Sequence, residues 1–323
     1  MAPAVEVVHV GSACRDIAPD DPRGWRLGGG VTYAALTTAR LGLRTAAVIG
    51  VDRDAQDAAE LDTLRAAGVD TLLVPLPEGP IFHNQETPAG RVQTAIQAGV
   101  PLQPVPLPKS WLDARGWSLV PVAAEVPDAW AALPADDAVV AVAWQGMLRR
   151  LTRGQLVERI EPRTSALLDR ADLVGVSRHD VDPATDLDAL VLLVRPGSRL
   201  LVTHGHAGGL LVRTDPSGAR EALRYLPTGS DGEIDPTGAG DTFLAALLAT
   251  VVRPSILGPR RGLGADLRFA AAAGSLAVEG VGLEGVPGLA DVQIRRARER
   301  VRRSVVPSLA AQVGALEGPF AEA

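Results

Sequence analysis

Ile234-Asp235-Pro236-Thr237-Gly238-Ala239-Gly240-Asp241-Thr242 is the most informative stretch of this chain. An apolar helical pattern follows it at once, so the small residues 238–240 stand where a helix begins. Free backbone N–H groups and the helix dipole favour an anion at such a position. Asp241 falls in the first turn, beside the bound anion. The pattern therefore predicts an anion site with its own carboxylate base, which suits phosphoryl transfer to a hydroxyl.

A simpler interpretation exists for the centre of this stretch. Gly-x-Gly-Asp is also an ordinary helix start, because Asp and Thr cap helix N-termini well. The longer string favours the functional interpretation. Asp235-Pro236-Thr237-Gly238-Ala239-Gly240-Asp241-Thr242-Phe243 closely resembles the C-terminal signature of the ribokinase (PfkB) family of carbohydrate kinases.

The length of the chain is enough for one large α/β domain or for two small ones. The chain has 323 residues, 46% of them hydrophobic and only 3% aromatic, which favours helices packed closely on a sheet. The net charge of −6 argues against a general nucleic-acid binder. The single cysteine, Cys14, excludes an intramolecular disulfide, and no stretch has the pattern of a signal peptide or a membrane span. We therefore expect a cytoplasmic protein without membrane or nucleic-acid partners.

Strand-like and helical segments alternate along most of the chain, as in a parallel sheet covered by helices on both faces. Residues 75–110 differ, because they are rich in proline and carry short alternating patterns that predict antiparallel strands outside the main sheet. An Ala-rich helix is predicted at 267–278. A basic helix follows at 291–303, and its arginines are expected on a solvated face. Main-sheet strands are predicted at residues 5–10, 45–50, 70–74, 138–143, 171–176 and 200–203.

Several separated motifs extend the family resemblance over roughly residues 5–300. They occur in the order that the family has them. A weaker likeness is to a subgroup that includes inositol 3-kinase-like proteins, and it rests on Phe82-His83-Asn84, Arg91-Val92-Gln93 and Gln145-Gly146-Met147-Leu148-Arg149. The main motifs are Gly28-Gly29-Gly30 through Arg40-Leu41-Gly42, Ile49-Gly50-Val51-Asp52, Gly68-Val69-Asp70, and Thr203-His204-Gly205-His206-Ala207-Gly208.

The resemblance implies an α/β fold, namely a ribokinase-like three-layer sandwich with a mostly parallel central sheet and a small, reduced β lid. Residues 1–305 would form the single domain, with the lid drawn from about 17–27 and 78–108, and 306–323 would be a C-terminal tail. We expect a reduced lid because only about ten residues separate Asp16 from Gly28. Dimerisation through the lid is therefore not assumed, and the chain is expected to be a monomer or a homodimer.

The resemblance also implies roles for individual residues. Asp241 would be the catalytic base, and the amides of Gly238, Ala239 and Gly240 would form the anion hole. Substrate would be bound by Asp16, Gly29, Gly30, Asn84 and Arg91. An Asp after a strand is also a common turn residue, and Arg91 is open to a solvated-strand interpretation. The nucleotide would be bound by Thr203, Gly205, Gly208, Thr237 and Ser177.

One motif departs from the family pattern. Many members carry Asn-x-x-Glu after a central strand, where it helps to organise Mg²⁺ and phosphates, whereas this chain has Ser177-Arg178-His179-Asp180. Asp180 keeps the carboxylate on a shorter stem, so we expect it to hold the metal through water. A monovalent cation near the signature stays open.

The expected function is an ATP- and Mg²⁺-dependent transfer of the γ-phosphoryl group to a hydroxyl of a small sugar or cyclitol. A nucleoside acceptor is ranked lower, because few aromatic residues are available to stack a base; Trp25, Tyr33 and Phe82 are the candidates. A catalytically silent sensor that binds a sugar or nucleotide is the alternative from another class. His204 and His206 belong to no Cys/His cluster that would indicate zinc. Their position makes them candidates to line the nucleotide site, but the interpretation as plain loop residues is ranked higher.

Overall fold

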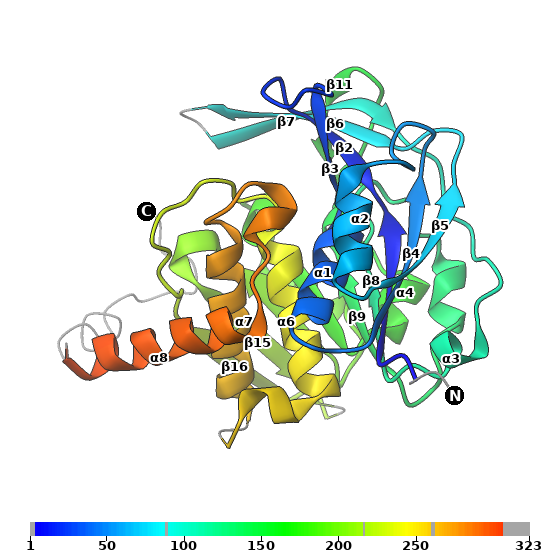
Figure 1. Cartoon of the computed structure of the whole chain (residues 1–323). Coiled ribbons are helices and arrows are strands. Elements are labelled where there is room, and N and C mark those ends of the chain that lie inside the picture. The colour runs from blue at the N-terminus through cyan, green and yellow to red at the C-terminus, as the bar shows by residue number, and fades with distance from the viewer. Residues whose placement is uncertain (1–3, 88–89, 216, 260–261, 306–323) are drawn as a thin grey trace.

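A computed structural model describes residues 4–87, 90–215, 217–259 and 262–305 (Figure 1). Within these ranges the middle layer is a nine-stranded sheet in the order β16-β15-β14-β13-β9-β8-β1-β4-β5. Neighbouring strands pair in parallel, except that β15 is antiparallel to both β14 and β16. The predicted α/β class with a mostly parallel sheet is therefore confirmed. The strands are β1 (Val7–Ser12), β4 (Thr45–Val51), β5 (Asp70–Pro75), β8 (Gly116–Leu119), β9 (Val139–Ala143), β13 (Leu173–Ser177), β14 (Arg199–Thr203), β15 (Gly209–Thr214) and β16 (Arg220–Tyr225).

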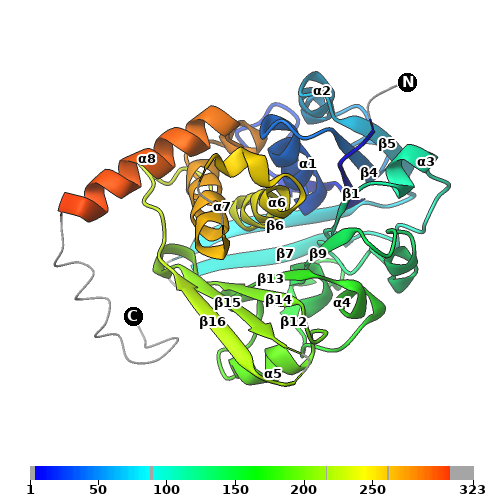
Figure 2. The ribbon, with the colours of Figure 1, turned by 90° about the horizontal axis from the view of Figure 1, so that it is seen from below.

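Helices cover both faces of this sheet (Figure 2). One face carries α1 (Gly30–Arg40), α2 (Ala59–Ala66), α6 (Ala239–Val252) and α7 (Leu263–Ala277), and the other carries α3 (Lys109–Leu112), α4 (Ala166–Arg170) and α5 (Leu187–Leu192). Strand side chains alternate between the two cores: Val7 packs with the first set of helices, and Val8 and Val10 pack with the second. Burial on both faces explains why the strands are continuously apolar.

Buried alanines line the contact between α6 and α7. Nearly every residue of α6 after its first turn is buried, and the alanines at 270–273 of α7 are buried as well. Small side chains allow the two helices to approach closely, which fixes α6 against the sheet. The position of α6 matters because its first turn carries Asp241.

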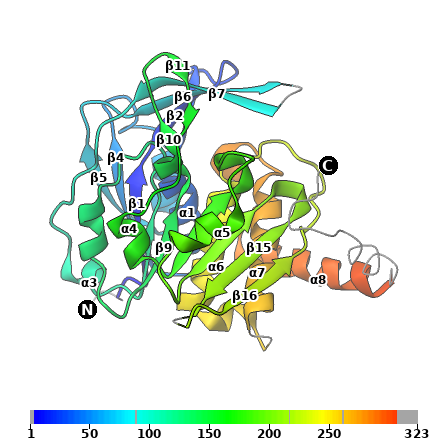
Figure 3. The same cartoon turned by 180° about the vertical axis from the view of Figure 1, so that it is seen from behind.

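A second, five-stranded sheet stands over one edge of the main sheet, at the top of both Figure 1 and Figure 3. Its order is β11-β7-β6-β2-β3. Strand β2 continues β1 after Ala13 alone, so the main sheet passes directly into this lid sheet. The strands are β2 (Cys14–Ile17), β3 (Trp25–Gly28), β6 (Pro80–Thr87), β7 (Gly90–Ala98) and β11 (Gln155–Leu156), and a separate ribbon pairs β10 (Arg149–Arg150) with β12 (Glu158–Arg159).

The last helix, α8 (Leu289–Val305), corrects one expectation. Its arginine run was expected on a solvated face, but Arg295 is only 4% exposed. Its guanidinium pairs with Glu279 at 2.7 Å and donates to the Gly229 carbonyl at 2.7 Å. The expectation was wrong for Arg295, because a helix face that meets acidic and carbonyl oxygens can bury an arginine. The side chain of Arg298 is 61% exposed, as expected. The predicted tail at 306–323 lies outside the described residues.

None of the helices in the described ranges combines the length and apolar character that a bilayer crossing requires.

Candidate active site

The predicted site residues meet at the edge of the main sheet where its parallel strands end. Ser12, Ser177 and Thr203 close β1, β13 and β14 there, and helices α1 and α6 begin above them. Open parallel sheets bind their ligands at this edge, because strand ends and helix N-termini converge on it.

The start of α6 is shaped by glycine and by Tyr33. Gly238 is the N-cap residue and has φ of 77°, a left-handed conformation that glycine adopts without strain. A Cβ at this position would also overlap the ring of Tyr33, which is 3% exposed. Asp235 holds the preceding turn, since its carboxylate accepts hydrogen bonds from the amides of Thr237 at 2.9 Å and Gly282 at 3.1 Å. The loop therefore has little freedom.

Of the residues expected to form the anion hole, Gly240 lies on open surface, since a Cβ there would meet nothing within 4 Å. The Ala239 amide donates a 3.3 Å hydrogen bond to the Pro236 carbonyl within the turn. An anion bound here would compete with that long bond. The anion-hole assignment remains a prediction.

Asp241 lies between the two helix starts. A Cβ on Gly30, the first residue of α1, would lie 2.7 Å from Asp241 Oδ1, so only glycine leaves the carboxyl in place. Burial raises the pKa of Asp241 to about 7, Asp180 adds to the shift, and Arg149 opposes it. A carboxyl with a pKa near the working pH is suited to accept and release a proton.

A buried polar cluster beside Asp241 fixes the charges around it. Asp180 is 9% exposed, and its Oδ1 accepts from Gln145 Nε2 at 2.9 Å and lies 3.6 Å from Arg149 Nη2. Its Oδ2 accepts from the Ser177 amide at 3.1 Å. Burial lowers the pKa of the Arg149 guanidinium, and the charges of Asp180 and Asp241 oppose that effect. Arg149 is thus a cation held among the acidic groups of the site.

This cluster limits how Asp180 could serve a metal. A carboxylate offers about four lone-pair sites; two accept hydrogen bonds from Gln145 and the Ser177 amide, and the Arg149 guanidinium lies 3.6 Å away. In the described residues no group of three or more His, Cys, Asp or Glu side chains could hold a metal ion. Mg²⁺ at phosphoryl-transfer sites usually keeps several waters and contacts one or two carboxylates. The geometry fits an Asp180 contact through water.

The substrate side is built where the lid meets the sheet. Asp16 on β2 accepts a hydrogen bond from Asn84 Nδ2 on β6 at 3.0 Å, and Asn84 Oδ1 accepts from Gln93 Nε2 on β7 at 2.6 Å. The structure thus joins Asp16 and Asn84, which the sequence presented separately. Gly29 has φ of 102° and lies against the turn between β1 and β2, where a Cβ would lie 2.5 Å from the Ser12 carbonyl. The side chain of Arg91 lies outside the described residues.

The donor side is formed by two neighbouring loops. Ser177 and Thr203 are register partners at the ends of β13 and β14. Gly205 and Gly208 have φ of 48° and 87°, and the loop closes with a 2.8 Å hydrogen bond from the His204 amide to the Gly208 carbonyl. These four residues share one edge of the sheet, as their predicted role requires, and Thr237 lies in the turn before α6.

A strained turn holds the junction between sheet and lid. Ala124 has φ of 56°, the one positive value at a non-glycine residue in the described ranges. It presents the carboxylate of Glu125, 2% exposed, to the amides of Ser12 at 3.0 Å, Val122 at 3.0 Å and Ala123 at 2.7 Å. Buried amides and carboxylate satisfy one another where β1 passes into β2.

Sequence reasoning missed four residues of the site as individual contributors. Gln93, Gln145 and Arg149 stood inside the strings that carried the weaker subgroup resemblance, so a signal was present without a role. Tyr33 was noted only as part of a helical pattern and as a candidate to stack a base. Its contact with Gly238 joins positions about 200 residues apart in sequence, and no local pattern indicates it.

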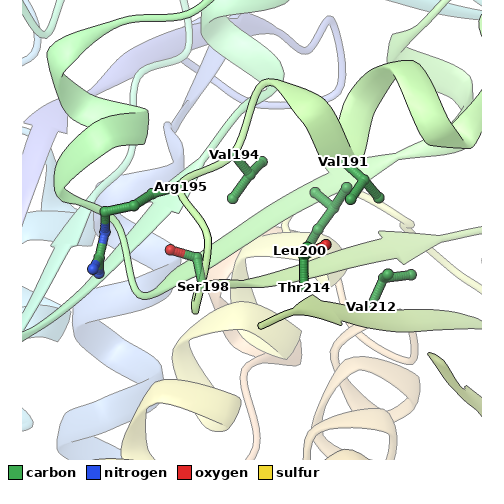
Figure 4. A pocket seen from close by; sticks show the side chains of 7 residues that line it. All are labelled: Val191, Val194, Arg195, Ser198, Leu200, Val212 and Thr214. Carbon is green, nitrogen blue, oxygen red and sulfur yellow. The ribbon is translucent and has the colours of Figure 1, made fainter. Parts of the chain in front are cut away.

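A small cavity elsewhere is not part of this site. It has a volume of about 10 Å³ and lies between α5 and the strands β14 and β15 (Figure 4). Ser198 and Thr214 place it at the opposite end of the sheet from Asp241. The Thr214 hydroxyl is buried there without a hydrogen-bond partner. The volume suits at most one water molecule.

Comparisons with known proteins fit this geometry. Residues 161–287 match the pfkB family carbohydrate kinase. Fructokinase-1 of Zea mays and Fructokinase-1 of Oryza sativa subsp. japonica are each 35% identical over 127 residues. Those residues are 36% of this chain and 38% of each fructokinase, so the match spans well under half of these relatives.

Solved structures are similar over nearly the whole described fold. A pyrophosphate-dependent kinase in the ribokinase family, complexed with a pyrophosphate analog and myo-inositol, has a TM-score of 0.67 at 20% identity, covering 89% of this chain and 99% of that one. Ribokinase from Giardia lamblia has a TM-score of 0.69 at 16% identity, covering 92% and 99%. Arabidopsis thaliana ribokinase, complexed with ribose and ATP, has a TM-score of 0.65 at 20% identity, covering 91% and 99%. The predicted family resemblance and fold class are confirmed. Residues 161–287 therefore match the pfkB family carbohydrate kinase, and the chain has the ribokinase-like fold.

Proposed function

We propose that this protein transfers the γ-phosphoryl group of ATP to a hydroxyl of a small sugar or cyclitol, with Asp241 as the base. The observation that carries the proposal is the position of Asp241. Its carboxyl has a pKa of about 7 and lies at the start of α6, among the substrate-side glycine Gly30, the donor-side turn of Asp180 and the cation of Arg149. A proton acceptor at that place lies between the proposed binding sites of the sugar and of ATP.

The chemical step follows from this arrangement. The acceptor hydroxyl donates its hydrogen bond to Asp241, and its oxygen forms a bond to the γ-phosphorus as the bond from that phosphorus to the bridging oxygen breaks. The hydroxyl proton passes to Asp241, and ADP leaves with the bridging oxygen. Amides at 238–240 and the guanidinium of Arg149 face the negative charge on the transferring group. Bound Mg²⁺, held through water by Asp180, would neutralise charge on the donor phosphates.

The side chains of the acceptor pocket favour a polyol. Asp16, Asn84 and Gln93 are linked one to the next by hydrogen bonds, so their polar groups form a row. Such a row suits adjacent hydroxyls on a ring. The aromatic candidates for stacking a nucleobase are otherwise engaged. Phe82 and Tyr33 are 2% and 3% exposed, and Trp25 lies beneath the guanidinium groups of Arg15 and Arg23. These contacts support a sugar or cyclitol acceptor over a nucleoside.

Inorganic pyrophosphate is a second candidate donor. It is favoured by the donor-side turn, where Ser177-Arg178-His179-Asp180 replaces the family's Asn-x-x-Glu, and by the likeness to a pyrophosphate-dependent kinase. A monovalent cation beside Asp235 remains an open part of the proposal. Assays with and without K⁺ test it directly.

The deciding experiment is a screen of sugars, inositols and nucleosides with Mg²⁺ and either ATP or pyrophosphate, run beside Asp241→Asn. Release of ADP or phosphate with one acceptor class, abolished in the variant, is the expected result. Donor binding without turnover by any acceptor would support the silent-sensor alternative instead. That alternative draws its support from the altered residues Ser177 and Asp180.

A further inference from the structure

Three of the five histidines of the chain gather at the donor side of the site. His179 lies in the turn after β13, and His204 and His206 lie in the loop after β14. The ring centroids of His179 and His204 are 5.4 Å apart. Since β13 and β14 are parallel neighbours, their ends bring these residues together at the edge that also carries Asp241.

Arg178 adds a permanent positive charge to this group. Its guanidinium donates to the carbonyl oxygens of Asp182, at 2.8 Å, and Pro183. These contacts fix its position and do not cancel its charge. Burial lowers the pKa of His204, and the positive charges of His179, His206 and Arg178 lower it further. The four side chains therefore share one electrostatic environment.

The neighbouring carboxylate does not neutralise this group. Asp180 is directed to Gln145, Arg149 and the Ser177 amide. The negative charge of Asp180 also raises the pKa of Asp241. The 177–180 turn is therefore close enough to the proposed base to act on it electrostatically. The turn therefore presents its carboxylate toward the base and also carries the Arg178 guanidinium and the His179 imidazole.

We propose that Arg178, His179 and His204 bind the donor phosphate next to the one that is transferred, and stabilise the charge that develops on it. This inference rests on the proposed function and extends it to the leaving side of the reaction. When the bond between the transferred phosphorus and the bridging oxygen breaks, its electron pair stays on that oxygen, which belongs to the leaving phosphate. The acceptor oxygen takes its place on phosphorus, and the acceptor proton goes to Asp241.

The ligand chemistry is a phosphate in a phosphoanhydride, and it has two sources. It is the β-phosphate of ATP or the second phosphate of inorganic pyrophosphate. The Arg178 guanidinium and the imidazole N–H groups of His179 and His204 take over part of the work that an Asn-x-x-Glu motif and its metal perform in other members. The donor should therefore bind measurably without Mg²⁺.

The test is calorimetric binding of inorganic pyrophosphate and, separately, of ADP to the full chain without Mg²⁺ and without acceptor. The double variant His179→Asn, His204→Asn should bind at least one probe about 10–100-fold more weakly than the unmodified protein, as expected for lost hydrogen bonds to a charged group. Arg115→Gln is the matched charge control: Arg115 is exposed and precedes β8, at the opposite end of the sheet. Its affinity should stay within twofold of the unmodified protein.

If the double variant loses affinity for pyrophosphate alone, the donor is inorganic. If it loses affinity for ADP alone, the donor is a nucleotide. Both outcomes support the phosphate site. Unchanged affinity for both probes in the double variant overturns it, as does failure of the unmodified protein to bind either. Binding needs no turnover, so the outcome is separate from that of the acceptor screen. If no acceptor reacts but the double variant loses affinity, the proposed kinase reaction fails while the phosphate site stands.

Discussion

Replacing Asp241 by Asn should abolish activity and yet stabilise the protein. The catalytic part follows from the loss of a positioned base, which typically lowers the rate by about 10²–10⁴-fold. The stability part follows from burial. The pKa of Asp241 is about 7 in the folded protein against 3.8 for an ordinary aspartate, so the fold resists ionisation of this carboxyl. Asn is nearly the same size and never ionises.

The magnitude can be worked out from that shift. A difference of about 3 pKa units corresponds to about 4 kcal/mol, since each unit is worth 1.36 kcal/mol. The carboxyl is partly accessible from the open site, so we expect about 1–3 kcal/mol. Because the folded pKa is raised, the group's stabilising contribution is complete below pH 3.8 and is lost as pH rises through 7. The advantage of Asn should therefore grow between pH 4 and 7 and level off above.

Thermal unfolding at pH 5 and pH 8 measures this effect. At pH 8 the variant should melt about 3–6 °C above the unmodified protein, with a smaller difference at pH 5. Acceptor-dependent turnover is measured on the same samples. Equal melting temperatures at both pH values would show that Asp241 is not desolvated, and near-normal turnover would refute its role as base.

The other predictions concern the surroundings of this carboxyl. The rate should rise with pH through a limb near pH 7, and Asp180→Asn should move that limb to lower pH, because it removes a charge that raises the pKa of Asp241; an unmoved limb in the pH–rate profile would contradict this. Gly30→Ala should lower kcat about 10²-fold by displacing the carboxyl, and it should also lower urea stability because the added Cβ would lie 2.9 Å from Val120 Cγ1; normal kcat would refute the contact. Asn84→Leu should raise the acceptor KM about tenfold and leave kcat within a few fold, whereas an unchanged KM would remove Asn84 from the acceptor pocket. Glu125→Gln should lower the free energy of unfolding by about 1–3 kcal/mol in urea titrations, since the amide nitrogen would replace one oxygen and face two of the three N–H groups; an unchanged free energy would show that these amides tolerate a neutral side chain.

The sequence by itself determined the features that depend on neighbours along the chain. The glycine-rich start of α6, the placement of Asp241 in its first turn and the alternation of strands and helices follow from local period and backbone preference. Two short or exposed strands were not predicted. Strand β8 has only four residues, and β16 is an exposed edge strand with mixed polarity. Such segments carry too little periodicity to be predicted.

Only the tertiary structure decided which side chains share a charge environment. The raised pKa of Asp241 depends on Asp180 and Arg149, which lie far from it in sequence, and on burial by helices that pack across the sheet. Burial and Coulomb energy depend on distance in space, so a motif can place a carboxylate without setting its proton affinity. Arg295 is a second example. The basic run around it predicted a solvated helix face, but in the fold Arg295 is buried against Glu279.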